Sequence, residues 1–172
     1  MTVRLSRRTL AFFGLVLVTA TVAFVLAGRS GADPKSTPLH GTFGNIQNFF
    51  FPACTSVTGV CSSFDASGSI QGSGIVNVDT DPRTDPNGFS KAHTDITTNK
   101  GNLACDEGAI FQGPVPPSQG TVHAFVDLCI INPTRSTGRY AGATGYIQEV
   151  GTFDFAAGVG SLDYYGQITY GN

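Results

Sequence analysis

The stretch Thr121-Val-His-Ala-Phe-Val-Asp-Leu-Cys-Ile-Ile131 alternates between two kinds of side chain over most of its length. Such alternation is typical of a β-strand, because successive side chains of a strand point to opposite faces. One face would carry Val122, Ala124, Val126, Leu128 and Ile130. The other would carry His123, Phe125, Asp127 and Cys129. The sequence therefore predicts a strand with one uniformly apolar face and one face that bears ionisable groups.

Short runs of β-branched and aromatic residues recur from His40 onward and are separated by Gly, Pro, Asn and Asp. No convincing helical period accompanies them, so the sequence predicts an all-β chain. We expect eight strands, which cover approximately residues 41–49, 62–71, 73–80, 89–98, 102–111, 121–131, 144–155 and 161–170. Eight short strands joined by turn signals favour an antiparallel barrel or sandwich.

The N-terminus has the layout of an export signal, with Arg4, Arg7 and Arg8 before an uncharged run over residues 9–28. We interpret residues 1–32 as a signal helix, of general or twin-arginine type, or as an uncleaved membrane anchor. Residues 33–39 are expected to be a linker and residues 40–172 the folded domain. The protein is thus expected to be secreted or held in the cell envelope, with membrane contact only through an uncleaved leader.

Charge argues against one class of partner. Beyond residue 32 the chain has 6 basic and 12 acidic residues, a formal charge of −6. Proteins that bind nucleic acid use clustered Lys and Arg to neutralise phosphates. We therefore expect no nucleic-acid partner.

All four cysteines follow the leader, and an even number of cysteines in an exported chain favours two disulfides. Three pairings are conceivable. Cys54 and Cys61 enclose a short, hairpin-like loop that a disulfide could close, which leaves Cys105 to pair with Cys129. A zinc site is a poor match, because the usual short spacing of paired ligands is missing.

The C-terminal part carries a glycine-rich segment, Ser136-Thr-Gly-Arg-Tyr-Ala-Gly-Ala-Thr-Gly145, and ends on a strand-like run over residues 162–170. With the long strand between them, these segments resemble the allene oxide cyclase and dirigent barrel superfamily, including exported bacterial proteins. The resemblance implies an eight-stranded antiparallel β-barrel around a hydrophobic cavity. In that superfamily the cavity holds an apolar ligand, and some members guide a cyclisation or a radical coupling. No catalytic residue of those enzymes matches this chain position by position, so none is carried over.

A cross-strand disulfide between Cys105 and Cys129 would fix a register. If the two cysteines are directly opposite, Glu107 faces Asp127, and His123 lies further along the same face. Opposed carboxylates raise one another's pKa, which is how acid–base pairs are formed. Glu107, Asp127 and His123 are therefore the candidate catalytic residues. The alternative is that this face is the solvated exterior, because the opposite face is the more uniformly apolar one.

We expect no metal or cofactor. Asp79, Asp81, Asp85 and Asn87 do not follow the EF-hand spacing and are interpreted as a polar turn. Two functions remain open: a module that binds a small apolar ligand or is purely structural, and a cofactor-free cyclase or isomerase. An open apolar interior that contains an ionisable group would favour the enzyme, and a filled interior would favour the module.

Overall fold

The computed structural model describes residues 35–50, 52–115 and 120–171. The expected signal or anchor at residues 1–32 lies outside these ranges. Within them, no helix is both long and apolar enough to cross a bilayer.

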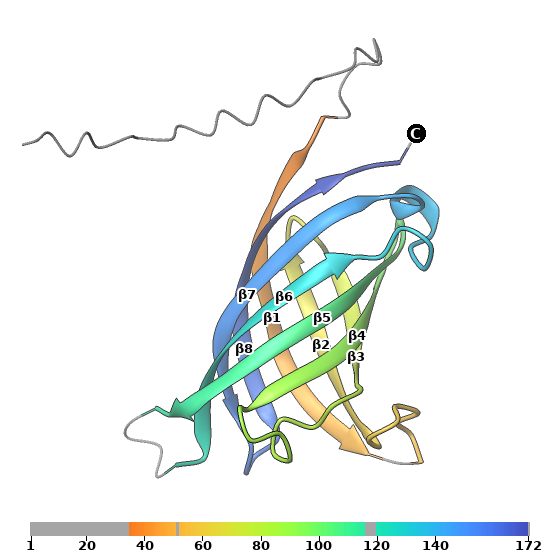
Figure 1. Cartoon of the computed structure of the whole chain (residues 1–172). Coiled ribbons are helices and arrows are strands. Elements are labelled where there is room, and N and C mark those ends of the chain that lie inside the picture. The colour runs from red at the N-terminus through yellow and green to blue at the C-terminus, as the bar shows by residue number, and fades with distance from the viewer. Residues whose placement is uncertain (1–34, 51, 116–119, 172) are drawn as a thin grey trace, which may run out of the picture. The chain divides into compact units, whose positions relative to one another are not determined.

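Eight antiparallel strands form a closed barrel (Figure 1). They are β1 (Thr37–Phe50), β2 (Val60–Gly68), β3 (Gly72–Val78), β4 (Phe89–Thr98), β5 (Gly101–Pro114), β6 (Val122–Ile131), β7 (Thr144–Asp154) and β8 (Val159–Thr169). Each strand pairs with its neighbours in the sequence, and β8 pairs with β1 to close the cylinder. The prediction of an eight-stranded antiparallel barrel is confirmed. β1 begins at Thr37, inside the segment expected to be linker, and Leu39 is already part of the core.

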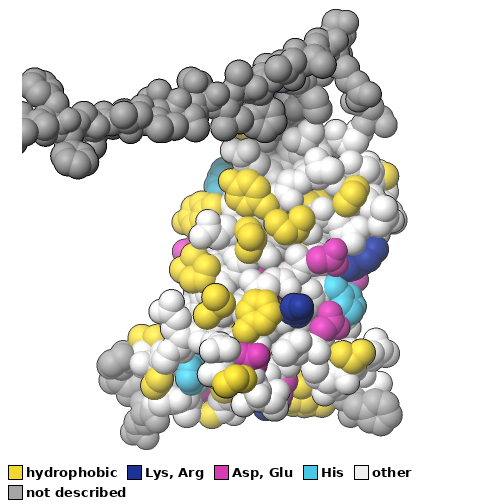
Figure 2. All heavy atoms as spheres, viewed as in Figure 1, with side chains coloured by type: hydrophobic (Ala, Val, Ile, Leu, Met, Phe, Trp, Pro, Cys, Tyr) yellow, Lys and Arg dark blue, Asp and Glu magenta, His cyan; other side chains and the backbone are white. Residues whose placement is uncertain are grey.

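The acidic face of β6 points into the barrel, although the other face of β6 is the more uniformly apolar one. On β6, Phe125, Asp127 and Cys129 are buried, whereas Val126, Leu128 and Ile130 on the other face are 39%, 46% and 50% exposed. The solvated-exterior alternative for the acidic face is therefore wrong. Several apolar side chains are exposed on the outer surface seen in Figure 2.

Both expected disulfides are present, with Cα–Cα distances of 5.5 Å for Cys54–Cys61 and 5.4 Å for Cys105–Cys129. The register assumed from the second disulfide is wrong by two residues. Cys105 lies opposite Ile131, and Cys129 lies opposite Glu107. The disulfide therefore joins diagonal neighbours on one face. The parity of the face is preserved, so Glu107 and Asp127 still point to the same side.

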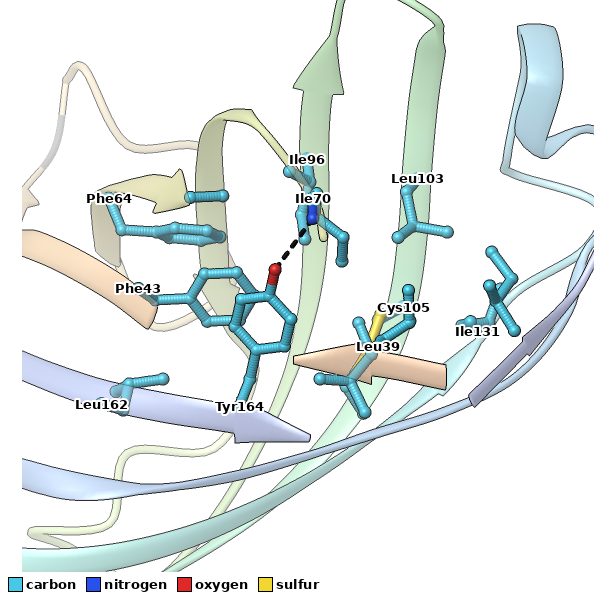
Figure 3. Close-up of a cluster of buried hydrophobic side chains, with 14 of the residues drawn as sticks. Leu39, Phe43, Phe64, Ile70, Ile96, Leu103, Cys105, Ile131, Leu162 and Tyr164 are labelled. Atoms are coloured by element: carbon cyan, nitrogen blue, oxygen red, sulfur yellow. Dashed lines mark hydrogen bonds between the residues drawn. A yellow bond between two sulfur atoms is a disulfide. The ribbon is translucent and has the colours of Figure 1, made fainter. Parts of the chain in front are cut away.

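One end of the barrel is filled by large side chains (Figure 3). Tyr164, Ile70, Ile96 and Leu103 are almost completely buried there. The Tyr164 hydroxyl accepts a hydrogen bond from the Ile70 N–H (2.8 Å) and donates one to the Ser67 carbonyl (3.0 Å). Filling by side chains is usual for barrels of eight strands.

Two glycines of the C-terminal glycine-rich segment, Gly138 and Gly145, lie close to the backbone of another segment. Both have positive φ angles, of 60° and 136°. A Cβ at Gly138 would collide with the Lys100 carbonyl, and one at Gly145 with the Gln167 carbonyl. Gly142 also has a positive φ, of 71°, but a Cβ there would make only an ordinary contact, at 3.6 Å from the Gly171 Cα, so its φ angle alone favours glycine.

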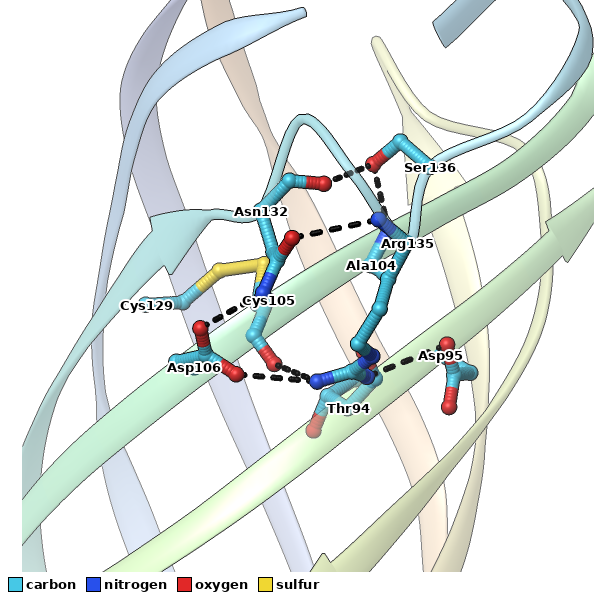
Figure 4. Close-up of a disulfide and its surroundings, with 9 residues drawn as sticks. All are labelled: Thr94, Asp95, Ala104, Cys105, Asp106, Cys129, Asn132, Arg135 and Ser136. Carbon is cyan, nitrogen blue, oxygen red and sulfur yellow. Dashed lines mark hydrogen bonds and ion pairs between the residues drawn. A yellow bond between two sulfur atoms is a disulfide. The ribbon is translucent and has the colours of Figure 1, made fainter. Parts of the chain in front are cut away.

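Arg135 holds the turn after β6 against two neighbouring strands (Figure 4). Its guanidinium donates to the carboxylates of Asp106 (2.9 Å) and Asp95 (3.2 Å). It also donates to the backbone carbonyls of Cys105 and Thr94. These contacts of Arg135, which we call the Arg135 clamp, fix the end of the barrel wall that carries the Cys105–Cys129 disulfide.

Candidate functional site

Three carboxyl groups point into the barrel from three consecutive strands. Glu107 comes from β5, Asp127 from β6 and Glu149 from β7. Asp127 lies directly opposite Glu149, whereas Glu107 lies opposite Cys129 and is thus diagonal to Asp127. Side chains at opposite and diagonal positions of one face are within reach of one another. We call Glu107, Asp127 and Glu149 the carboxyl cluster.

The cluster is enclosed by protein. Asp127 and Glu149 are only 5% and 6% exposed. Glu107 is partly exposed, but it lines the internal cavity, so the surface that it leaves open faces the barrel interior. A charge on any of the three is therefore poorly hydrated, which favours the protonated form.

The environment raises all three pKa values. Burial raises the pKa of Glu107 well above its ordinary value of 4.5, and the negative charge of Asp127 adds to the rise. Burial also raises the pKa of Asp127 from 3.8 to about 6, against the opposing effect of nearby backbone N–H groups. The pKa of Glu149 is raised well above 4.5 by burial and by the charges of the other two carboxyls. The cluster thus combines Asp127, with a pKa of about 6, with two glutamates whose pKa values are shifted further toward the protonated form by burial.

Two buried oxygens near the cluster lack a hydrogen-bond partner among the described residues. One is Oδ1 of Asp127, and the other is the hydroxyl oxygen of Thr94 on β4. Thr94 is 2% exposed and is close enough to Glu107 for its hydroxyl to lower the pKa of that carboxyl. Buried polar atoms are rarely left unpaired in native proteins.

A cavity of about 250 Å³ lies in the barrel and is lined by the carboxyl cluster. Phenylalanine rings contribute much of the remaining wall. They are Phe43, Phe64, Phe111, Phe125, Phe153 and Phe155. Arg83 also lines the cavity, but its side chain is 54% exposed and bound to Asp81, which places it at the solvent end. The barrel is therefore filled at one end and hollow at the other.

His123 is not part of the cluster, although it was expected on the same face. Its Nδ1 lies 2.8 Å from the carbonyl oxygen of Gln112, and its ring packs against Phe155. On β6, Phe125 lies between His123 and Asp127 on the inward face, and His123 does not line the cavity. Glu107 and Asp127 are brought together as predicted, but His123 is not.

Glu149 is the member of the cluster that the sequence analysis missed. Its signal was present, because Ile147, Glu149 and Phe153 share one face of the alternating β7 segment. An acid between two large apolar residues of the same parity indicates an inward carboxyl in a barrel.

The described residues do not offer a clear metal site in the oxidised protein. Ligand atoms of Glu107, Glu149 and Cys129 lie within 4.8 Å of one another. The Cys129 sulfur, however, is bonded to Cys105 and cannot serve as a thiolate ligand. The polar loop at residues 79–88 is organised as a turn, with Asp81 bound by Arg83 and Asp85 accepting a bond from the Asn87 N–H.

Together these features define an antiparallel barrel whose strands form a closed cylinder. One end of its interior is filled by side chains, and the other holds a phenylalanine-lined cavity with three carboxyl groups. Comparisons with protein-family profiles, with curated proteins and with solved structures gave no match for this chain.

Proposed function

We propose that this barrel binds a small, largely apolar molecule in its internal cavity, against the carboxyl cluster. The observation that carries the proposal is the cavity itself, with its phenylalanine wall and its few polar groups gathered at one place. Ligand sites commonly combine an apolar lining with a small number of polar groups that orient the ligand. The resemblance to the allene oxide cyclase and dirigent barrels supports the same function.

The first test is native mass spectrometry of the exported protein purified from its own host. A retained molecule, together with the mass of two disulfides, is the expected result. The second test uses benzyl alcohol as a defined probe and follows chemical-shift changes in residues that line the cavity. Ala92→Leu, which adds bulk inside the cavity, should weaken binding, whereas Ala124→Leu on the outer face of β6 should not. The absence of both a retained molecule and a probe-dependent shift would contradict the proposal.

A second candidate function is a cofactor-free cyclase or isomerase, and the pKa values of the cluster favour it. Burial favours the protonated form of Glu107, and Asp127 has a pKa of about 6, so the pair would supply a general acid and a general base within one cavity. In an isomerisation, the carboxylate would take a proton from one atom of the substrate, and the carboxyl would give a proton to another. The proton count of the cluster is then unchanged after one turnover.

Deuterium exchange at the α-carbon of cyclohexanone in D₂O tests this second function with a simple enolisable probe. The wild-type protein should accelerate the exchange above the buffer rate, and Glu107→Gln and Asp127→Asn should remove the acceleration. Asp163→Asn, on the outside of β8, is the matched control and should leave the rate unchanged. Equal rates for the wild type and for buffer alone would refute an acid–base role.

A further inference from the structure

We propose that the cavity selects a small amine in its ammonium form, with an apolar body that lies against the phenylalanine wall. The inference rests on the proposed binding function and adds the chemical class of the ligand.

The ionisable groups at the closed end of the cavity are all acidic. Glu107, Asp127 and Glu149 line it there, and the described lining residues include one cationic side chain, that of Arg83. Arg83 is bound to Asp81 at the solvent end. Arg135, whose charge lowers the pKa of Glu107, is held on the outer side of the wall by Asp95 and Asp106. Among the residues that the structure describes, the closed end of the cavity thus offers carboxyl acceptors and no lysine or arginine counter-ion.

The unpaired carboxylate oxygen of Asp127 requires a hydrogen-bond donor. This Oδ1 atom is buried without a partner in the described part of the chain. An ammonium group has three N–H donors and no acceptor. One such group at the cluster would pair with a charged oxygen of Asp127 and still have donors for a second carboxyl.

The aromatic wall suits the same class of ligand. The faces of phenylalanine rings attract cations, and their carbon surfaces accept an apolar body. Phe111 packs against Phe125 at 5.0 Å and against Phe155 at 5.1 Å between ring centroids, so this part of the wall is a continuous aromatic surface. Phe125 and Asp127 are inward neighbours on β6, which places ring and carboxyl side by side.

Other ligand charges fit the cavity less well. A carboxylate or phosphate at the carboxyl cluster would meet three acidic side chains and no cationic side chain from the described part of the wall. A hydrated divalent cation requires six or more oxygen ligands, and most of this wall is phenylalanine carbon. A neutral apolar molecule would fit the wall but would leave the Asp127 oxygen unpaired.

The experiment compares benzylamine with benzyl alcohol, which share one apolar body and differ in charge. Affinities are measured at pH 8 by titration calorimetry, with chemical shifts of the cavity residues as the check on location. We expect benzylamine to bind at least about tenfold more tightly than benzyl alcohol. At pH 5, where Asp127 is largely protonated, this advantage should shrink. Asp127→Asn and Glu149→Gln should each reduce it, and Asp163→Asn, which removes a charge from the outer face, should preserve it.

The outcomes separate the two proposals. If both probes bind with equal affinity, the amine inference is overturned and the binding function stands. If neither probe binds, the amine inference is overturned, and the binding function fails with it when native mass spectrometry also finds no retained molecule. If benzylamine keeps its full advantage in the Asp127→Asn and Glu149→Gln proteins, it binds through surface charge and the inference is again overturned. Near-ultraviolet circular dichroism establishes that each variant retains the wild-type fold.

Discussion

Replacement of Asp127 by asparagine should stabilise the folded protein at pH 8 and change the pH dependence of its stability. Asparagine has nearly the shape of aspartate and keeps an acceptor oxygen for the backbone N–H groups near this position. It cannot ionise, however, and the ionised form is the one that burial disfavours. The substitution therefore removes an electrostatic cost of folding without opening a void.

The magnitude follows from the pKa of Asp127. A rise from 3.8 to about 6 on folding corresponds to about 3 kcal/mol. Because the folded-state pKa is the higher one, this contribution to stability is fully present below pH 3.8 and is lost as the pH rises through about 6. We expect the wild-type free energy of unfolding to fall over this window. At pH 8, Asp127→Asn should exceed the wild type by up to about 3 kcal/mol, and at pH 3 the two should be nearly equal.

The assay is urea denaturation of the oxidised protein at half-unit pH intervals from 3 to 8. Asp163→Asn is the control, because it removes one carboxyl from the outer face and reports the effect of net charge alone. The reasoning is refuted if the difference between Asp127→Asn and the wild type is independent of pH. It is also refuted if Asp163→Asn reproduces the whole gain.

Three further predictions can be tested in the same urea assay at one pH. Gly145→Ala should lower the free energy of unfolding by about 2 kcal/mol or more, because its φ is 136° and a Cβ would meet a backbone carbonyl of β8. Gly142→Ala, where the added Cβ would make only an ordinary van der Waals contact, should lower it by only about 1 kcal/mol, and equal losses would refute the close-approach argument. Tyr164→Phe should cost about 1–3 kcal/mol by leaving a buried N–H without its acceptor, whereas Tyr165→Phe on the outer face should have little effect. Arg135→Lys should cost about 1 kcal/mol or less, because its ion pairs are partly exposed; a larger loss would mean that the clamp is stronger than its exposure indicates.

The strands were predictable because each has its own local signal. The strand expected at 89–98 has the same bounds as β4, and Lys91 and Asp95 lie outward on it while Thr94 and Ile96 lie inward. The main differences are at strand ends. β1 begins before its expected start, because Thr37 and Leu39 pair with the end of β8, a partner that no local pattern reveals.

The register between β5 and β6 was not predictable from the disulfide alone. A disulfide restricts the distance between two Cα atoms, and both opposite and diagonal positions of a barrel wall can meet that restriction. Cys105 and Cys129 occupy diagonal positions, with Ile131 opposite Cys105. Parity survives a shift of two residues, so the prediction that Glu107 and Asp127 share a face was correct although their pairing was not.

The choice of inward face required information on volume as well as polarity. The acidic face of β6 carries Phe125 and Cys129, and its partner face on β5 carries Leu103 and Phe111. Large rings and buried cysteines fill the interior of an eight-stranded barrel, whereas aliphatic side chains can lie half-exposed on its outer wall. A count of apolar residues on each face of β6 favoured the face of Val126 as the inward one, because the count ignored the size of the side chains.

The stability prediction and the amine inference depend on the same electrostatic cost. An ionised Asp127 destabilises the empty barrel because its charge is poorly hydrated, and an ammonium ligand would provide the missing partner. A ligand that binds only the folded state raises its stability. Benzylamine should therefore raise the melting temperature of the wild type more at pH 8 than at pH 5, and should raise that of Asp127→Asn less at both pH values. A variant that gained stability without losing this ligand-induced rise would separate the two effects and contradict their common origin.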